Sequence, residues 1–183
     1  MAEFSQRIDQ LKSTHEQDKE LLMNEIIESA KAAGYTVADV DIHRPWGGFV
    51  RFDYADGDRF VEEFFPGVDP VQARLGNPAA ELSPKILLVT PEQRLSWQVH
   101  ERRAERWVFL NDGGYYKSTD ADNPGELILA SAGDVVQFEA GECHRLVGAS
   151  DDVTLVAEIW QHTDPTNPSD EEDIIRLQDD YKR

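Results

Sequence analysis

Residues 96–110 read SWQVHERRAERWVFL and contain the pattern that decides how this chain is interpreted. They place a Gln-x-His, ending at His100, five residues before Glu105. A second stretch, GDVVQFEAGECH over residues 133–144, ends in His144. Two histidines and one carboxylate, supplied by two separate strand-forming stretches, can make a facial metal site that leaves positions open for a substrate.

Strand geometry predicts which of these side chains meet. Residues two apart share a face of a strand, so Gln98 and His100 point the same way. Glu105 opens the next strand, and a hairpin brings it beside His100. His144 follows a tight turn at Ala140–Gly141. We therefore predict Gln98, His100, Glu105 and His144 as metal ligands.

The same residues also have an ordinary interpretation. A single histidine in a strand is more often a core or surface residue than a ligand, and Glu105 lies in a charged run, 101–106, that could be a solvated corner. Imidazole with carboxylate suits several divalent ions, so the expected cofactor is zinc, with iron, manganese, cobalt or nickel as alternatives.

Length and composition indicate one soluble domain with a sizeable core. The chain has 183 residues, of which 40% are hydrophobic and 30% charged. It contains no apolar run of membrane-spanning length and no signal-peptide pattern, and its single cysteine, Cys143, fits a reducing cytoplasm. The net charge of −18 argues against nucleic acid and against anionic membranes as partners.

Periodicity predicts a helix over residues 3–33, then many short strands separated by turn residues. We expect an N-terminal helical extension, 1–34, and one domain over 35–183. The expected strands are Gly48–Tyr54, Arg59–Phe65, Ile86–Thr90, Leu95–His100, Glu105–Leu110, Tyr115–Lys117, Leu127–Ala130, Asp134–Glu139, His144–Val147 and Val153–Trp160. Such a series is typical of a β-sandwich or a small barrel. Pro66–Ser83 is expected to be irregular, with one or two helical turns. Ser169-Asp-Glu-Glu resembles a capping box and predicts a C-terminal helix.

The two motif stretches together resemble the double motif of the cupins, and in particular the cupin domain of type II mannose-6-phosphate isomerases. The segments that carry the resemblance are RPWG at 44–47, QRLSWQVH at 93–100, RAERW at 103–107, AGECHRL at 140–146 and DIIRLQDDYKR at 173–183. The resemblance implies an all-β cupin barrel, which is a double-stranded β-helix or jelly roll. The N-terminal and C-terminal helices predicted above are then added to that barrel. The resemblance also implies a divalent metal and interconversion of mannose 6-phosphate and fructose 6-phosphate.

The chain departs from that family at several positions. Gln98 stands where most cupins have histidine, although the isomerase group itself commonly has glutamine there. Glu101 and Arg102 stand where histidine is frequent, and Glu139 where proline is frequent. The segment 56–84 and the N-terminal helix have no counterpart in the family pattern.

Aldose–ketose isomerisation needs a base that moves a proton between neighbouring carbons. Glu158 lies in an apolar strand, where a carboxylate is costly unless it is used or paired. Glu158 and Arg176 are the predicted catalytic residues. Arginine and lysine suit a phosphate, although most can simply balance surface carboxylates. The predicted substrate-binding residues are Lys85, Arg94, Arg103, Arg145 and Arg183.

Several functions remain open at this point. The first is a metal-dependent isomerase of a sugar phosphate, with a pentose or heptose as alternative substrates. The second is a sugar-binding or regulatory cupin without catalysis, and the third is an iron-dependent oxygenase, which the same ligand set permits. The expected partners are a small sugar or sugar phosphate and, because exposed sheet edges are a liability, a second copy of the chain in a homodimer.

Overall fold

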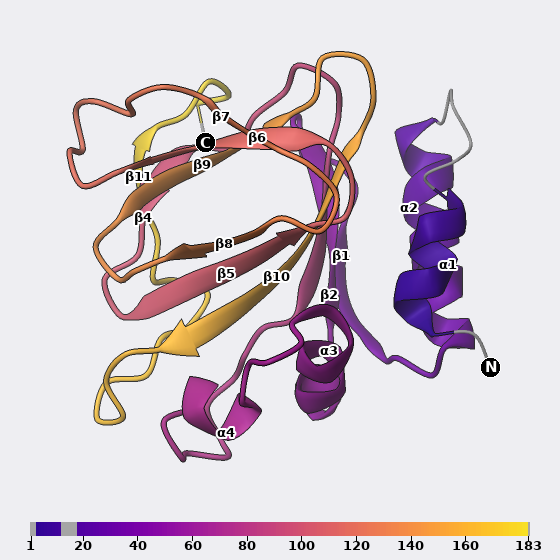
Figure 1. Ribbon diagram of the computed structural model, residues 1–183, viewed down its shortest axis with the longest axis horizontal. Coiled ribbons are helices and arrows are strands. Elements are labelled where there is room, and N and C mark those ends of the chain that lie inside the picture. The colour runs from indigo at the N-terminus through magenta and orange to yellow at the C-terminus, as the bar shows by residue number, and fades with distance from the viewer. Residues whose placement is uncertain (1–2, 12–17, 183) are drawn as a thin grey trace.

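The computed structural model describes residues 3–11 and 18–182 and consists mainly of two antiparallel sheets. Figure 1 shows the two sheets enclosing an interior, with the helices outside one of them. The six-stranded sheet has the order β1 (Val37–Asp41), β2 (Gly47–Phe52), β3 (Lys85–Val89), β10 (Thr154–His162), β5 (Arg103–Phe109), β8 (Val135–Phe138). The five-stranded sheet has the order β11 (Ile175–Gln178), β4 (Trp97–Val99), β9 (Cys143–Gly148), β6 (Gly113–Ser118), β7 (Ile128–Ala130). The predicted all-β barrel is confirmed.

The central strands β3, β10 and β5 of the six-stranded sheet are buried on both faces, and successive side chains along each strand point to opposite faces. In β10, Leu155, Ala157 and Ile159 belong to a hydrophobic cluster shared with the helices. Val156, one residue along, belongs to a second cluster between the two sheets. Glu158 and Trp160 follow Val156 at a spacing of two, so they point into the barrel interior.

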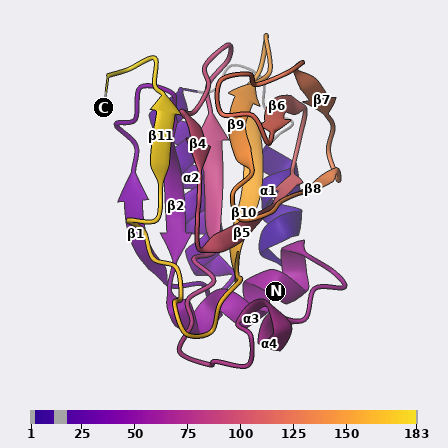
Figure 2. The same ribbon diagram turned by 90° about the vertical axis from the view of Figure 1, so that its left-hand side faces the viewer.

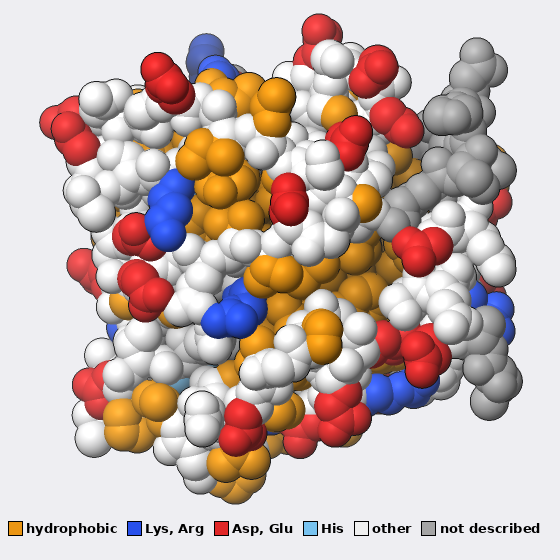
Figure 3. Space-filling model, viewed as in Figure 1, with side chains coloured by type: hydrophobic (Ala, Val, Ile, Leu, Met, Phe, Trp, Pro, Cys, Tyr) orange, Lys and Arg blue, Asp and Glu red, His pale blue; other side chains and the backbone are white. Residues whose placement is uncertain are grey.

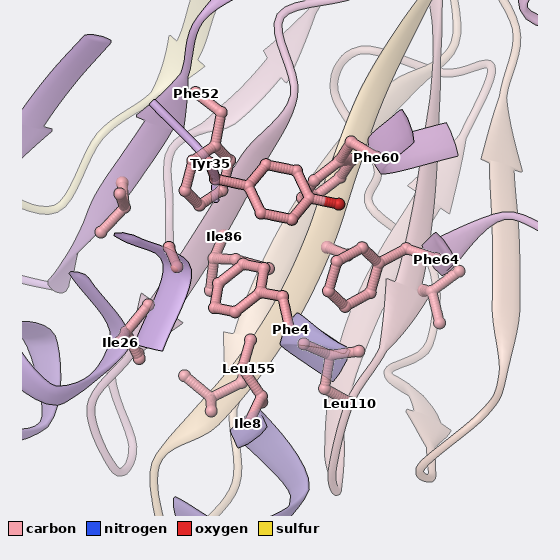
Figure 4. Close-up of a cluster of buried hydrophobic side chains, with 14 of the residues drawn as sticks. Phe4, Ile8, Ile26, Tyr35, Phe52, Phe60, Phe64, Ile86, Leu110 and Leu155 are labelled. Atoms are coloured by element: carbon pink, nitrogen blue, oxygen red, sulfur yellow. The ribbon is translucent and has the colours of Figure 1, made fainter. Parts of the chain in front are cut away.

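The helix-side cluster is rich in aromatic rings. Phe60 lies 4.6 Å from Phe64 and 5.5 Å from Phe52 between ring centroids, and Phe4 lies 5.3 Å from Tyr35. Figure 4 shows these rings converging from the helices and from the sheet. Fully buried aromatic side chains contribute strongly to folding, so this cluster fixes the helices onto the barrel.

The predicted single helix over 3–33 is wrong. Helix α1 covers Phe4–Leu11 and α2 covers Lys19–Ala32, and Figure 1 shows them side by side. The carboxylate of Asp18 accepts a hydrogen bond from the amide of Glu20, and its own backbone has ψ 127°, so it caps α2 instead of continuing a helix. Part of the predicted helix, 12–17, lies outside the described residues.

The predicted strand Arg59–Phe65 is also wrong, because helix α3 covers Gly57–Phe64. Phe60, Val61 and Phe64 are buried at helical spacing and face the aromatic cluster. A short 3-10 turn, η1 (Tyr54–Asp56), precedes α3, and the one further helix of the described chain between α3 and β3 is α4 (Pro70–Ala73).

The predicted C-terminal helix is replaced by a strand. In β11, Ile175 is opposite Val99 of β4 and Arg176 is opposite Gln98. The Ser169 hydroxyl donates to the carboxylate of Asp173 at 2.7 Å, so the capping-box residues form a turn that is closed by side chains. Figure 2 views the side of the barrel where β11 and β1 are the sheet edges; β1 was not among the predicted strands.

None of the helices in the described part of the chain combines the length and apolarity that crossing a bilayer requires. Acidic side chains are spread around the face shown in Figure 3, as the net charge of −18 leads one to expect. The helices share a hydrophobic cluster with the sheet. The division of the chain at residue 34 and the homodimer both stay predictions.

Candidate metal centre

Three predicted ligands meet in the barrel interior. His100 Nε2 lies 3.0 Å from Glu105 Oε1, and His144 Nε2 lies 3.2 Å from Glu105 Oε2. All three side chains are at most 2% exposed, and the candidate ligand atoms lie within 4.8 Å of one another. The chain brings them together from the end of β4, from β5 and from β9.

The chemistry of these groups fits a divalent metal. Glu105 Oε2 and His144 Nε2 are buried, and among the described residues neither makes a hydrogen bond. Such orphaned polar atoms are costly unless a ligand satisfies them. Burial acts to raise the pKa of Glu105, but the neighbouring imidazole of His100, the guanidinium of Arg103 and the imidazole of His144 hold that pKa well below its usual value. Burial lowers the pKa of His144, which favours the neutral imidazole that coordinates metals.

Backbone carbonyls orient both imidazole rings. His100 Nδ1 donates to the carbonyl oxygen of Asp173, and His144 Nδ1 donates to that of Glu142 at 3.1 Å. A carbonyl only accepts, so each Nδ1 carries the proton and each Nε2 keeps its lone pair for a metal. A hydrogen bond from the Gly141 amide to the His100 carbonyl, 2.8 Å, ties the two motif stretches together.

Gln98 lies next to this group. It is opposite His144 in the pairing of β4 with β9, and its amide nitrogen lies 3.4 Å from His100 Nε2. Its amide oxygen accepts a hydrogen bond of 2.8 Å from the Ser96 hydroxyl. A rotation of the amide exchanges these two atoms, so the oxygen can face the ligand group. The role of Gln98 as a fourth ligand stays a prediction.

A cavity of about 350 Å³ opens beside the ligand group, and Glu158 is in its wall. The indole N–H of Trp107 donates to Glu158 Oε2 at 3.0 Å, and Lys85 Nζ lies 3.5 Å from Oε1. Burial, together with the charge of Glu105, raises the pKa of Glu158 to about 7, although Lys85 and Arg103 act to lower it. A carboxyl group with such a pKa can exchange protons near neutral pH.

The predicted cationic residues divide into two groups. Lys85, Arg103 and Arg176 line the cavity. Arg103 lies 3.0 Å from Glu105 and stacks at 3.9 Å over the ring of Trp160.

Arg94 and Arg145 do not line it. Arg94 pairs with Asp180 at 2.6 Å. Arg145 follows His144 in β9, points to the opposite face, and donates to the carbonyl of Gln178 at 3.0 Å. We therefore do not keep these two as substrate ligands. Arg183 lies outside the described residues.

Sequence reasoning missed the residue that organises the ligand loop. Asp173 accepts hydrogen bonds from the amides of Glu101 at 2.9 Å and Arg102 at 3.0 Å, and its carbonyl holds His100. The sequence interpretation placed Asp173 inside a helix. The nearest sign in the sequence that this segment packs against the barrel is the apolar pair Ile174–Ile175, directly after Asp173. Other missed cavity residues are Asp39, Arg44, Trp46, Phe49, Arg51, Leu87, Leu95, Ser96, Glu171 and Ile174.

No family model matches this chain, and no curated protein matches it. Among solved structures it is similar to the capsular polysaccharide assembling protein CapF from Staphylococcus aureus, with a TM-score of 0.50 and 13% identity over 86% of this chain and 37% of that chain. A Cupin 2 conserved barrel domain protein from Salinispora arenicola matches with a TM-score of 0.45 and 15% identity, over 68% of this chain and 82% of that one. A sugar phosphate isomerase from a cupin superfamily, from Silicibacter pomeroyi, matches with a TM-score of 0.39 and 14% identity, over 45% and 51%.

These similarities concern the fold, because identities this low carry no information on substrate. The chain spans only 37% of the CapF chain that it matches. The CapF match therefore bears on the arrangement of the two antiparallel sheets and not on the residues inside them. In its fold, this chain is a barrel of two antiparallel sheets that is similar to part of the CapF chain.

Proposed function

We propose that this chain is a metal-dependent aldose–ketose isomerase that acts on a sugar phosphate. One observation carries the proposal. A buried His100–Glu105–His144 group, suited to a divalent ion, adjoins a cavity that also contains Glu158, a carboxyl group whose pKa is raised to about 7. The combination of a metal site and a proton-transferring group is what this isomerisation requires.

The metal ligands of this chain would be His100, Glu105 and His144. A divalent ion held there supplies Lewis-acid polarisation of the carbonyl and hydroxyl oxygens of a sugar. Glu158 then removes the proton next to the carbonyl and returns it to the neighbouring carbon. The Trp107 N–H fixes one oxygen of Glu158, which leaves the other to face Lys85 and the cavity.

Cations in the cavity support a phosphorylated substrate. The chain carries a net charge of −18, so an anionic ligand needs a local excess of positive groups. Lys85, Arg103 and Arg176 line the same cavity as Glu158. The sequence resemblance makes mannose 6-phosphate the first substrate to test.

The test uses the protein loaded in turn with zinc, iron, manganese, cobalt and nickel, and incubated with mannose 6-phosphate, then with other hexose, pentose and heptose phosphates. Formation of the partner ketose or aldose, with uptake of deuterium from heavy water at the isomerised carbon, is expected. Stoichiometric bound metal without turnover of any of these sugars contradicts the proposal and favours a sugar-binding cupin. Oxygen consumption with ferrous iron and no isomerised sugar favours an oxygenase.

A further inference from the structure

A glutamate from the loop between β10 and β11 contacts two donors of the cavity wall, Arg51 and Lys85, and one donor beside it, Ser83. Glu171 accepts a hydrogen bond of 2.9 Å from the Ser83 hydroxyl, and its carboxylate lies 3.2 Å from Lys85 Nζ. The guanidinium of Arg51 lies 3.9 Å away. Ser83 and Lys85 are buried, whereas the Glu171 side chain is 52% exposed. A half-exposed carboxylate therefore reaches into donors that the barrel holds in place.

The donors are positioned by the sheet and not by Glu171. Arg51 of β2 is opposite Lys85 of β3, and Lys85 is opposite Glu158 of β10, so the three side chains lie in one row across the sheet. Ser83, two residues before Lys85, has φ 44°. A non-glycine residue in this left-handed region is strained and persists only where the surrounding structure holds it.

Glu171 can leave this position without a movement of its loop. The loop is anchored on both sides, because the Ser169 hydroxyl bonds to Asp173 and Asp173 bonds to the amides of Glu101 and Arg102. Rotation of the Glu171 side chain is then sufficient to expose the donors. Burial acts to raise the pKa of Glu171, but the charge of Lys85 and hydrogen bonds from Ser83 and Lys85 lower it, so the group is an anion.

We propose that Arg51, Ser83 and Lys85 form the subsite for the phosphate group of the substrate, and that Glu171 occupies it until substrate binds. A guanidinium, an ammonium and a hydroxyl group are suitable donors to phosphate oxygens. The ammonium group of Lys85 contacts both Glu158 and Glu171, so the subsite lies directly beside the proposed base. The proposal rests on the function proposed above.

Displacement of Glu171 also changes the charge of the cavity. The cavity wall contains five basic residues and four acidic ones, of which Glu171 is one. When its carboxylate turns to solvent, the positive excess at the wall grows. An otherwise acidic protein thereby offers an anion a locally favourable field.

Calorimetric titration of the metal-loaded protein with inorganic phosphate tests the subsite. Glu171→Gln is expected to tighten phosphate binding about fivefold, because the half-exposed ion pair between Glu171 and Lys85 no longer competes with phosphate. Glu172→Gln is the matched control, because it removes the same charge from the neighbouring exposed position and should leave the affinity unchanged. Adding Ser83→Ala to Glu171→Gln should abolish the gain. Equal affinities for Glu171→Gln and Glu172→Gln, or a gain that survives Ser83→Ala, overturn the subsite.

Kinetics separate this proposal from the proposed function. Glu171→Gln should lower KM for the sugar phosphate and leave KM for the unphosphorylated sugar unchanged. If no sugar is isomerised but Glu171→Gln still tightens phosphate binding specifically, the isomerase fails and the subsite stands. If sugar phosphates are isomerised and Glu171→Gln changes neither phosphate affinity nor KM, the subsite fails and the isomerase stands.

Discussion

The two faces of the six-stranded sheet are built by the same strands and differ in kind. Toward the helices, β10 presents Leu155, Ala157 and Ile159 to a continuous hydrophobic cluster. Toward the interior, the same strand presents Glu158 and Trp160 to charged groups and the cavity. Because successive side chains of a strand point to opposite faces, one strand can serve stability on one face and chemistry on the other.

The interior face retains buried charges because each has a partner. Glu105 lies 3.0 Å from Arg103, and Glu158 lies 3.5 Å from Lys85. Burial of unpaired charges is strongly unfavourable, and even paired charges add little to stability. The hydrophobic cluster on the helix side of the same sheet offsets that cost.

The largest expected effect is on the interior face. Glu105→Gln keeps the shape of the side chain but removes the charge that both histidines face. Loss of a residue that only hydrogen-bonds to a metal ligand lowers metal affinity by up to about 100-fold, so loss of this ligand should lower it by more than about 100-fold. Elemental analysis and chelator competition measure this. Glu139→Gln, on an exposed residue, is the control. If Glu105→Gln binds metal as the unaltered protein does, the interior face is not a metal site.

A substitution on the helix side of the sheet should lower stability and leave metal affinity unchanged. Phe60 is fully buried among four aromatic rings, and Phe60→Ala should lower the free energy of unfolding by about 3–5 kcal/mol, measured by urea denaturation. Metal affinity of the folded protein should be retained. Leu129→Ala, at a residue 78% exposed, should change stability by less than about 0.5 kcal/mol. Loss of metal affinity in folded Phe60→Ala protein shows that the two faces are coupled.

A change at Glu158 should affect catalysis and leave the metal site intact. Glu158→Gln should slow isomerisation about 100-fold or more while metal binding persists. As a base Glu158 must be ionised, so turnover should rise as pH rises through about 7, or through a lower pH because a bound cation favours the carboxylate. A pH–rate profile measures this, and an unchanged profile in Glu158→Gln excludes Glu158 as the base.

The raised pKa of Glu158 should make the folded state less stable as pH rises, whereas turnover should increase. The folded state holds the proton of Glu158 more tightly than the unfolded state, so this contribution is present below the usual pKa of 4.5 and is lost as pH rises through about 7. Metal-free Glu158→Gln should not show this loss. Thermal denaturation of the metal-free protein across that range measures it.

The strands and the ligand group could be predicted from sequence because their signals are local. An apolar run marked β10, and the spacing from His100 to Glu105 matched a known motif. The prediction of a strand at α3 was wrong because the segment is short. Over so few residues, the apolar side chains of Phe60, Val61 and Phe64 fit a buried strand as well as one face of a helix. Contact with the aromatic cluster, which is not local, decides between them.

The supporting residues could not be predicted because their partners are distant in sequence. Asp173 caps the amides of Glu101 and Arg102, more than 70 residues away. The local sequence from Ser169 fits the start of a helix as well as it fits the turn that the structure shows. Pairing of β11 with β4 is a tertiary event that overrides this local preference, and it places both Glu171 and Asp173 at the cavity.

The hydrogen bond from His100 to the Asp173 carbonyl joins residues 73 positions apart. During synthesis, the barrel core and the helix-side cluster are therefore available to fold before this support of His100 has emerged. The candidate ligand His100 then gains its carbonyl partner only after residue 173 has been made. A nascent or truncated chain that lacks residue 173 should therefore hold a metal ion poorly at this site.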